Sequence, residues 1–278
     1  MASLGDLLRQ QAVNIDLPKG GTGDIVSVCA VDEIAQQLNM PGHTVEAEAL
    51  KRDIIPTRYL RNMDSITATD QIQLLESRIA QVGLGGLGGN LLEMFLRTGV
   101  GYIRGADGDT FEESNLNRQL LSMPDAIGIP KAEAAAKRAA SLNSSTTFEG
   151  HNSFLTKDNL PDFLEGADVA IDALGGLEMR LALQQAAAQK NIPLVTGALA
   201  GWTGYVGVVL PGQVGPANIM GDDNGAEEKL GCPAPSVTFM ASLMAAETVR
   251  LLTGSKSPLA GTIMVIDLKS LTFEKITL

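Results

Sequence analysis

Short apolar runs alternate with helical patterns along much of the chain. An apolar run at 79–82 leads into a glycine-rich turn, a helical pattern of apolar residues follows at 91–96, and a second apolar run lies at 101–104. The succession of strand, helix and strand recurs between 169 and 196. Strands that alternate with helices are typical of βαβ units. The pattern therefore predicts an α/β fold with a parallel sheet at its centre.

The C-terminal part has a different pattern. A helix is predicted at 237–252, where Ala, Met and Leu recur at helical spacing and indicate that most of its surface is buried. Residues 261–267 and 272–277 alternate apolar and polar side chains, as the strands of an edge hairpin do. The polar, glycine-rich segment 211–230 is predicted to be a mobile loop.

The first 55 residues differ from the rest in their pattern, which predicts helices and a loop but no strand. The helices are predicted at 4–13, 31–38 and 45–52. We therefore divide the chain into a helical N-terminal extension at 1–55 and a main domain at 56–278.

Residues 33–50, EIAQQLNMPGHTVEAEAL, have the pattern of a helix-turn-helix motif. Contact of the second helix with DNA is one interpretation, but Glu46 and Glu48 place negative charge where a recognition helix carries Lys, Arg or Asn. A helical arm that packs on the core or on a partner subunit is the preferred interpretation.

Bulk composition narrows the class of protein. The chain has 278 residues, 45% of them hydrophobic, and 30 glycines, which is typical of a compact enzyme with a sizeable core. Its net charge of −11 argues against a surface for nucleic acid or anionic membrane, because phosphate binding needs a basic footprint. With two cysteines, no signal peptide and no apolar run long enough to span a bilayer, we expect a cytoplasmic protein.

The glycine-rich turn after the first strand predicts an anion site. Gly83 allows a sharp turn, Gly85 with its neighbour Gly86 allows backbone N–H groups to approach a phosphate, and Gly88 allows close packing of helix and strand. Asp107, about 20 residues further on, is placed to bind ribose hydroxyls. These features alone also suit NAD, so a dinucleotide-dependent oxidoreductase is one alternative.

The residues after Asp107 favour a triphosphate with a metal over a dinucleotide. Asp109 adds a second carboxylate, and Asn115, Arg118 and Gln119 add amides and a guanidinium just past the strand end. The pattern DxDxxxxSNLxRQ after GxGGLG resembles the HesA/MoeB/ThiF family, the prokaryotic relatives of ubiquitin-activating enzymes. The resemblance covers roughly residues 58–278.

The resemblance implies a fold, an activity and partners. The fold is a Rossmann-like, doubly wound α/β fold with a mixed sheet, a C-terminal antiparallel portion and a small helical N-terminal arm, in a homodimer. The activity is ATP-dependent adenylation of the C-terminal Gly-Gly carboxylate of a small ubiquitin-like sulfur-carrier protein, with Mg²⁺ and release of pyrophosphate. A non-catalytic protein that binds nucleotide or carrier is a second alternative.

The family pattern also implies roles for particular residues. Asp107 would hold the ribose and Asp109 would help to hold magnesium. Arg118 and Lys131 would neutralise the triphosphate, Lys131 as the lysine of a GxxK motif at a helix start. Arg61, in the segment that resembles RYxRQ, would contact the phosphates in the other subunit; a plain surface charge is its alternative.

One departure from the family falls at the end of the strand 169–171. Asp172 stands there and is assigned to cofactor binding, but Gly175 and Gly176 occupy the positions of an Asp-Asn pair whose aspartate helps to hold magnesium in the family. A carboxylate from elsewhere, such as Glu178, is one substitute. Arg180 fits the pattern.

Other departures concern cysteine and the carrier groove. The two CxxC pairs of zinc-containing relatives are absent, which predicts no structural zinc. A reactive cysteine in many relatives would lie near Glu227, whereas Cys232 lies inside the Gly-Cys-Pro motif, where a buried structural role is favoured over a nucleophile. Glycines between 197 and 207 are expected to line the groove for the carrier's tail, with Trp202 packed over it or purely structural.

Overall fold

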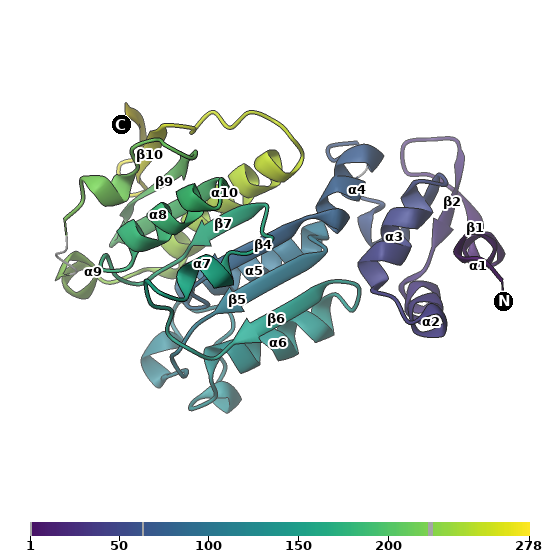
Figure 1. The fold of residues 1–278 in the computed structure, drawn as a ribbon, viewed down its shortest axis with the longest axis horizontal. Coiled ribbons are helices and arrows are strands. Elements are labelled where there is room, and N and C mark those ends of the chain that lie inside the picture. The colour runs from purple at the N-terminus through teal and green to yellow at the C-terminus, as the bar shows by residue number, and fades with distance from the viewer. Residues whose placement is uncertain (1, 63, 222–224) are drawn as a thin grey trace.

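The computed structural model describes residues 2–62, 64–221 and 225–278. A smaller N-terminal unit lies at one end of the molecule, and a larger α/β domain follows it (Figure 1). Helix α4 (Ala68–Glu76) lies between them in the chain and leads into the first strand of the large sheet. None of the helices in the described ranges is both long and apolar enough to cross a membrane.

The N-terminal unit is mixed α/β. It consists of α1 (Leu4–Gln11), β1 (Val13–Asp16), β2 (Thr22–Val26), α2 (Val28–Leu38), α3 (Gly42–Leu50) and β3 (Ile54–Pro56). Strands β1 and β2 form an antiparallel hairpin, and β3 pairs parallel with β2. The three predicted helices are present, but the expectation of an entirely helical extension is wrong.

Helix α3 packs on the main domain through a buried polar cluster. Glu46 is 1% exposed, and its carboxylate accepts a hydrogen bond from the Tyr59 hydroxyl at 3.0 Å and lies 3.2 Å from Nε of Arg58. Asn143 Nδ2 donates to the same hydroxyl at 3.4 Å. Burial raises the pKa of Glu46, with Arg58 opposing. The second helix of the supposed helix-turn-helix motif is therefore held against the core rather than presented to a DNA groove.

The main domain contains one eight-stranded mixed sheet. Its strands are β4 (Arg78–Val82), β5 (Tyr102–Ala106), β6 (Thr147–His151), β7 (Val169–Asp172), β8 (Leu194–Ala200), β9 (Thr203–Val209), β10 (Thr262–Asp267) and β11 (Thr272–Thr277). The spatial order is β11-β10-β9-β8-β7-β4-β5-β6. Strands β6, β5, β4, β7 and β8 are parallel neighbours, and β8 to β11 pair antiparallel. The mixed sheet and the C-terminal hairpin confirm the predicted fold class.

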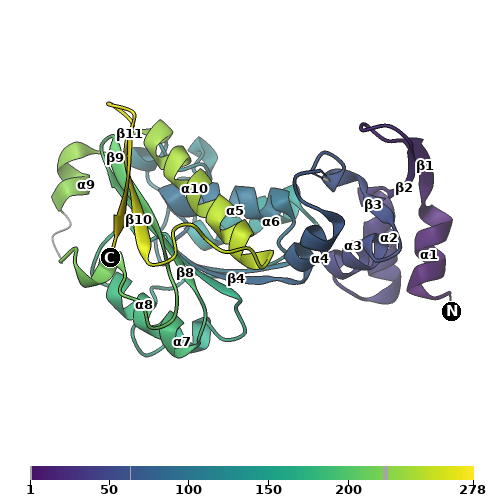
Figure 2. The same cartoon turned by 90° about the horizontal axis from the view of Figure 1, so that it is seen from above.

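Helices cover both faces of this sheet (Figure 2). Helices α5 (Gly86–Thr98), α6 (Lys131–Leu142) and α10 (Ala234–Leu252) pack on one face, and α7 (Leu160–Phe163) and α8 (Arg180–Gln189) pack on the other. Helix α9 (Gly225–Leu230) lies in the segment between β9 and α10. The segment 211–230, expected to be a loop, thus contains the 3₁₀ helix Pro216–Asn218 and the short helix α9, and its residues 222–224 lie outside the described part.

Successive strands are added on opposite sides of β4, so a topological switch point lies between β4 and β7, although the two strands are parallel. Strand β5 follows β4 in the chain and lies on one side of it, whereas β7 lies on the other side. In open α/β sheets, ligands bind in the crevice beyond the carboxyl ends of the strands at such a switch point. The residues that follow β4, β5 and β7 therefore meet at one edge of the sheet.

Candidate functional site

Glycines shape the turn between β4 and α5. Gly83 has a φ of +100°, and a Cβ there would lie 2.3 Å from the carbonyl oxygen of Ala173. A Cβ on Gly88 would lie 2.0 Å from the carbonyl oxygen of Gly83, so a side chain at 88 would push the helix off the turn. Nε2 of Gln81 donates to the carbonyl oxygens of Gly83 at 3.0 Å and Gly88 at 2.9 Å. Sequence reasoning missed this role of Gln81.

A cavity of about 520 Å³ opens over this turn at the carboxyl edge of the sheet. Gly85 is the N-cap of α5, and both Gly85 and Gly86 line the cavity. The first N–H groups of a helix have no partner within it, and the helix dipole favours negative charge at this end. The floor of the cavity is thus suited to an anion.

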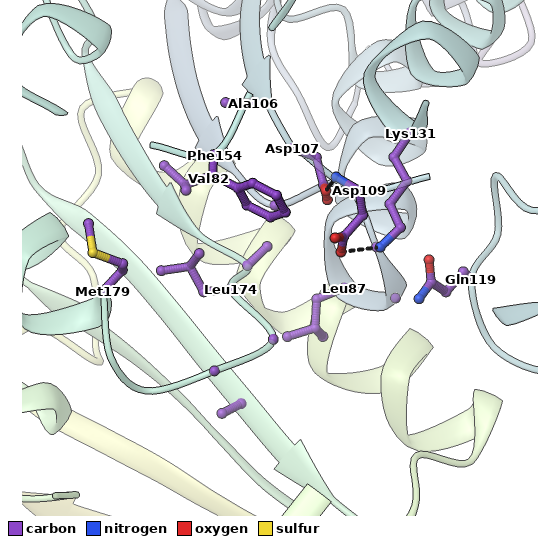
Figure 3. Close-up of a pocket in the computed structure, with 18 of the residues that line it drawn as sticks. Val82, Leu87, Ala106, Asp107, Asp109, Gln119, Lys131, Phe154, Leu174 and Met179 are labelled. Atoms are coloured by element: carbon purple, nitrogen blue, oxygen red, sulfur yellow. Dashed lines mark hydrogen bonds and ion pairs between the residues drawn. The ribbon is translucent and has the colours of Figure 1, made fainter. Parts of the chain in front are cut away.

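Asp107 and Asp109 enter the cavity from the end of β5 (Figure 3). Asp107 Oδ2 accepts the N–H of Leu84 at 2.8 Å, and its Oδ1 accepts the N–H of Asp109 at 2.9 Å. The carboxylate therefore joins the glycine turn to the β5 loop. A carboxylate has about four lone-pair sites, so Asp107 can still accept hydrogen bonds from a ligand.

Lys131 reaches the same cavity from the first turn of α6. Its Nζ donates to Asp109 Oδ2 at 2.9 Å, shown as a dashed line in Figure 3. The lysine side chain is 9% exposed and the aspartate side chain is 54% exposed. The ion pair therefore combines a mostly enclosed cation with an accessible carboxylate.

Segment 113–119 forms another side of the cavity. Arg118 Nη1 donates to the carbonyl oxygen of Ser114 at 3.1 Å and to Asn117 Oδ1 at 2.9 Å. Asn115 and Gln119 are buried lining residues. Oε1 of Gln119 has no hydrogen-bond partner among the described residues, and the Gln119 amide lies beside Gly85. This buried acceptor at the cavity wall is open to a hydrogen bond from a polar ligand.

The opposite end of the cavity is apolar. Phe154, Leu174 and Met179 lie on that side in Figure 3, away from Lys131 and Gln119. Phe154 is 69% exposed and packs over Gly108, where a Cβ would lie 2.5 Å from its ring. Sequence reasoning missed this wall; the one available signal was an unexplained aromatic residue soon after a strand.

The structure brings together most of the predicted site residues. Those that line the cavity are Gly83, Gly85, Gly86, Asp107, Asp109, Asn115, Arg118, Gln119 and Lys131. Gly88 lies behind the turn as a packing residue. Arg61 is exposed and does not line the cavity of its own chain.

Asp172 was assigned to the cofactor, but the structure places it inside the protein. Its Oδ2 accepts hydrogen bonds from Arg180 Nη1 at 2.8 Å and Thr196 Oγ1 at 2.7 Å, and its side chain is 1% exposed. Burial is the largest single effect and lowers the pKa of Arg180, but Asp172 together with the other nearby acidic groups outweighs it, so the pKa of Arg180 is raised. Asp172 therefore holds Arg180, and it is Arg180 that lines the cavity.

The missing aspartate would have stood at the cavity, but its suggested substitute Glu178 does not reach it. Gly175 and Gly176 line the cavity, whereas Glu178 is exposed and outside the lining. Glu227 of α9 lines the cavity and accepts a hydrogen bond from the Cys232 thiol at 3.4 Å. Burial, reinforced by the negative charge of Glu227, raises the pKa of Cys232 to about 12. Such a thiol is protonated at neutral pH, which agrees with a structural role.

The glycines of the β8–β9 hairpin are explained by packing within the protein. A Cβ on Gly197 would lie 2.6 Å from Met244 Sδ, and one on Gly204 would lie 2.6 Å from the carbonyl oxygen of Ala198. Packing within the protein therefore explains why glycine stands at these positions, without a bound carrier tail. Trp202 is exposed and does not line the cavity.

No group of three or more His, Cys, Asp or Glu side chains within the described ranges is arranged to hold a metal ion. Cys29 and Cys232 are both free thiols, the first exposed on α2. Any cation in the cavity would therefore take part of its coordination from a ligand or from water.

The fold and the cavity define a class of protein, a Rossmann-like α/β protein with an anion site at the switch point of its sheet. The chain belongs to the ThiF family, whose model matches residues 59–278.

Relatives extend over most of the chain. It is 32% identical to the sulfur carrier protein ThiS adenylyltransferase of Escherichia coli, over 80% of this chain and 90% of the relative. It is also 32% identical to the sulfur carrier protein adenylyltransferase of Thermus thermophilus, over 79% and 86%. The crystal structure of E. coli MccB with ATP superposes with a TM-score of 0.69 at 20% identity, over 79% of this chain and 70% of MccB, and so shares its fold.

Proposed function

We propose that this protein uses ATP to adenylate the C-terminal Gly-Gly carboxylate of a small ubiquitin-like sulfur-carrier protein. A carboxylate oxygen of the carrier attacks the α-phosphorus, the bond from that phosphorus to the pyrophosphate oxygen breaks, and carrier acyl-adenylate and pyrophosphate form. One observation carries the proposal: the cavity is apolar at Phe154 and Met179, as a base requires, and cationic at Lys131 and Arg118, as a triphosphate requires. The two adenylyltransferase relatives support it.

In this proposal the protein acts by positioning and charge. The N–H groups at the start of α5, with Lys131 and Arg118, neutralise the triphosphate and the charge that develops on the leaving pyrophosphate. Asp107 accepts hydrogen bonds from the ribose, and the Phe154 ring offers an apolar contact to the base. Ala198 and Leu199 line the cavity at β8 and mark the side from which the carrier's tail approaches.

Magnesium fits the donor set of the cavity. Mg²⁺ is usually held by one or two carboxylates together with phosphate oxygens and water. Asp109 offers an accessible carboxylate next to the cations that would hold the phosphates. When bound, the ion supplies further neutralisation of phosphate charge.

A homodimer is part of the proposal. Four apolar side chains flanking Arg118 are between 38% and 53% exposed: Leu116, Leu120, Met123 and Ile127. Exposed apolar side chains beside a functional site are typical of a protein interface. In our proposal a second copy covers these side chains and brings its own Arg61 towards the phosphates. We also propose a cytoplasmic location, which suits an ATP-dependent enzyme with two free thiols.

Nucleotide choice tests this proposal against an NAD-dependent oxidoreductase. Stabilisation by a ligand at 100 times its Kd is about 2.7 kcal/mol. For a domain of this size that corresponds to a rise in Tm of about 5–10 °C. We expect ATP with Mg²⁺ to produce such a rise and NAD to produce none. A rise with NAD alone would contradict the proposal.

A further inference from the structure

The cavity contains a carboxylate to which neither the sequence pattern nor the proposed reaction gives a role. Three carboxylates line it within the described ranges, those of Asp107, Asp109 and Glu227. Asp107 uses an oxygen for each of two main-chain N–H groups, and Asp109 is paired with Lys131. Glu227 accepts only the weak thiol donor of Cys232, on Oε1, so that Oε2 has no partner among the described residues.

The backbone around Glu227 is held in place by hydrogen bonds. The N–H of Gly231 donates to the carbonyl oxygen of Glu227 at 2.8 Å, and the N–H of Gly201 donates to the carbonyl oxygen of Gly231 at 2.7 Å. Helix α9 is thereby tied to the turn between β8 and β9. The half-buried Glu227 side chain is consequently presented to the cavity from a fixed point.

The charge of Glu227 acts on another residue that lines the cavity. It acts with Asp172 to raise the pKa of Arg180, which lines the cavity from α8. Arg118 lowers the pKa of Cys232, the hydrogen-bond partner of Glu227, against the larger effect of burial. Glu227 therefore shares the cavity with two arginines, Arg118 and Arg180.

Two other carboxylates, those of Asp172 and Glu178, do not replace the aspartate that is missing at position 175. Asp172 is buried and committed to Arg180 and Thr196. Glu178 is exposed and lies outside the lining. Gly175 lines the cavity, and a Cβ placed on it would meet nothing within 4 Å. There is thus open space at position 175, and α9 contributes a carboxylate, Glu227, to the same cavity.

We propose that Glu227 supplies a second protein carboxylate, beside Asp109, to the divalent cation that accompanies the nucleotide. Phosphate oxygens and water complete the coordination. Two carboxylates with a substrate phosphate are a usual donor set for Mg²⁺. The inference rests on the proposed nucleotide site, and it assigns to α9 a role that the end of β7 cannot fill in this chain.

Cation binding can be measured apart from turnover. Mn²⁺ replaces Mg²⁺, the α,β-methylene analogue of ATP replaces the substrate, and the EPR signal of free Mn²⁺ reports the Kd in the ternary complex of the full chain. We expect Glu227→Gln to raise the Mn²⁺ Kd by about 10-fold or more, as loss of a ligand or its support does. The matched control Glu178→Gln leaves it unchanged. Calorimetry without metal should show that Glu227→Gln binds the analogue as wild type does.

The outcomes separate this inference from the proposed function. An unchanged Mn²⁺ Kd in Glu227→Gln, with the analogue still bound, overturns the role of Glu227 alone. Loss of metal-free analogue binding in that variant also overturns it, because Glu227 would then act on the nucleotide. Failure of the wild type to bind the analogue at all overturns the proposed function as well.

A second variant pair tests whether a carboxylate is what the cation needs. In the Glu227→Gln background, Gly175→Asp places a carboxylate in the open space at the end of β7, and Gly175→Asn places an uncharged side chain of the same shape there. We expect Asp to restore the Mn²⁺ Kd to within about threefold of wild type, as a replacement carboxylate ligand would, and Asn to leave it weak. Equal Kd values for the two variants would contradict the proposal.

Discussion

Lys131 binds Asp109 twice, through its side chain and through its main chain. Its Nζ donates to Asp109 Oδ2 at 2.9 Å, and its N–H donates to the carbonyl oxygen of Asp109 at 2.9 Å. The start of α6 is thereby fixed to the loop after β5. This pair places the cation proposed for the phosphates beside the carboxylate proposed for magnesium.

Removal of either cavity cation should affect chemistry far more than folding. Lys131→Ala and Arg118→Ala each remove phosphate neutralisation but little core packing, and the main-chain bond between residues 131 and 109 remains. We expect each variant to lower the rate of carrier-dependent pyrophosphate release by about 100-fold or more. Lys137→Ala, an exposed lysine on the same helix, is the matched control. Wild-type rates in Lys131→Ala or Arg118→Ala would remove the phosphate assignment.

The Asp172–Arg180 pair should matter for stability without any ligand. Asp172→Asn leaves the buried Arg180 guanidinium without its counter-charge, and breaking a buried pair costs about 3–5 kcal/mol. We expect urea unfolding of the ligand-free protein to show a loss of that size. Asp158→Asn, at an exposed carboxylate, should change the free energy of unfolding by less than about 0.5 kcal/mol. Unchanged stability together with weaker nucleotide binding would instead favour the cofactor role first assigned to Asp172.

The thiol of Cys232 should be unreactive at neutral pH. Its pKa of about 12, three units above the reference value, reduces the thiolate fraction by about 10³-fold, so alkylation by iodoacetamide should be slow and should accelerate as pH rises towards 12. Glu227→Gln removes one cause of the raised pKa of Cys232, so it should speed alkylation of Cys232 at every pH below about 12. Mass spectrometry after tryptic digestion separates Cys232 from Cys29.

An unreactive Cys232 thiol should not form a covalent intermediate with the carrier. We expect Cys232→Ser to retain carrier adenylation and to form no less covalent adduct than wild type, because we expect the activated carrier to pass directly to an external sulfur donor. The measurement is intact mass of the enzyme after incubation with ATP, Mg²⁺ and carrier, with and without reductant. A reductant- or hydroxylamine-sensitive adduct that vanishes in Cys232→Ser would make Cys232 a catalytic nucleophile.

Metal content gives an independent prediction. Two cysteines and two histidines cannot form the four-thiolate site of zinc-containing relatives, and Cys29 lies in the N-terminal unit while Cys232 lies at the cavity. We expect purified protein to contain no stoichiometric zinc by inductively coupled plasma mass spectrometry. One zinc per chain would contradict this expectation.

The parts of the fold that depend on local signals were predictable from the sequence. The glycine turn at 83–88, the helix from Lys131 to Leu142 and the terminal hairpin each carry their pattern within a few residues. Strands β1 and β2 were missed because they are short. Strand β1 is mostly exposed, and β2 depends on pairing with β3, which lies 30 residues away in sequence (Asp24 with Ile54). No local pattern encodes such a partner.

The site residues also fall into those that a local motif predicts and those that depend on tertiary packing. Lining residues inside the DxDxxxxSNLxRQ motif were found because they are close together in sequence. Asp172 was misassigned because its partners, Arg180 and Thr196, come from other elements and decide whether it faces the cavity or the core. Phe154 and Glu227 reach the cavity from separate segments, and only tertiary packing brings them there.

The central claim is adenylation of a carrier protein, and ATP–pyrophosphate exchange measures that step directly. The protein would be incubated with ATP, Mg²⁺, labelled pyrophosphate and a small ubiquitin-like carrier, ideally one encoded beside this protein. A carrier that lacks its final Gly-Gly is the control. We predict label incorporation into ATP with the intact carrier, none with the truncated carrier, and a loss of about 100-fold or more with Lys131→Ala. Nucleotide and carrier binding without any exchange would contradict the account and identify the protein as a non-catalytic binding protein.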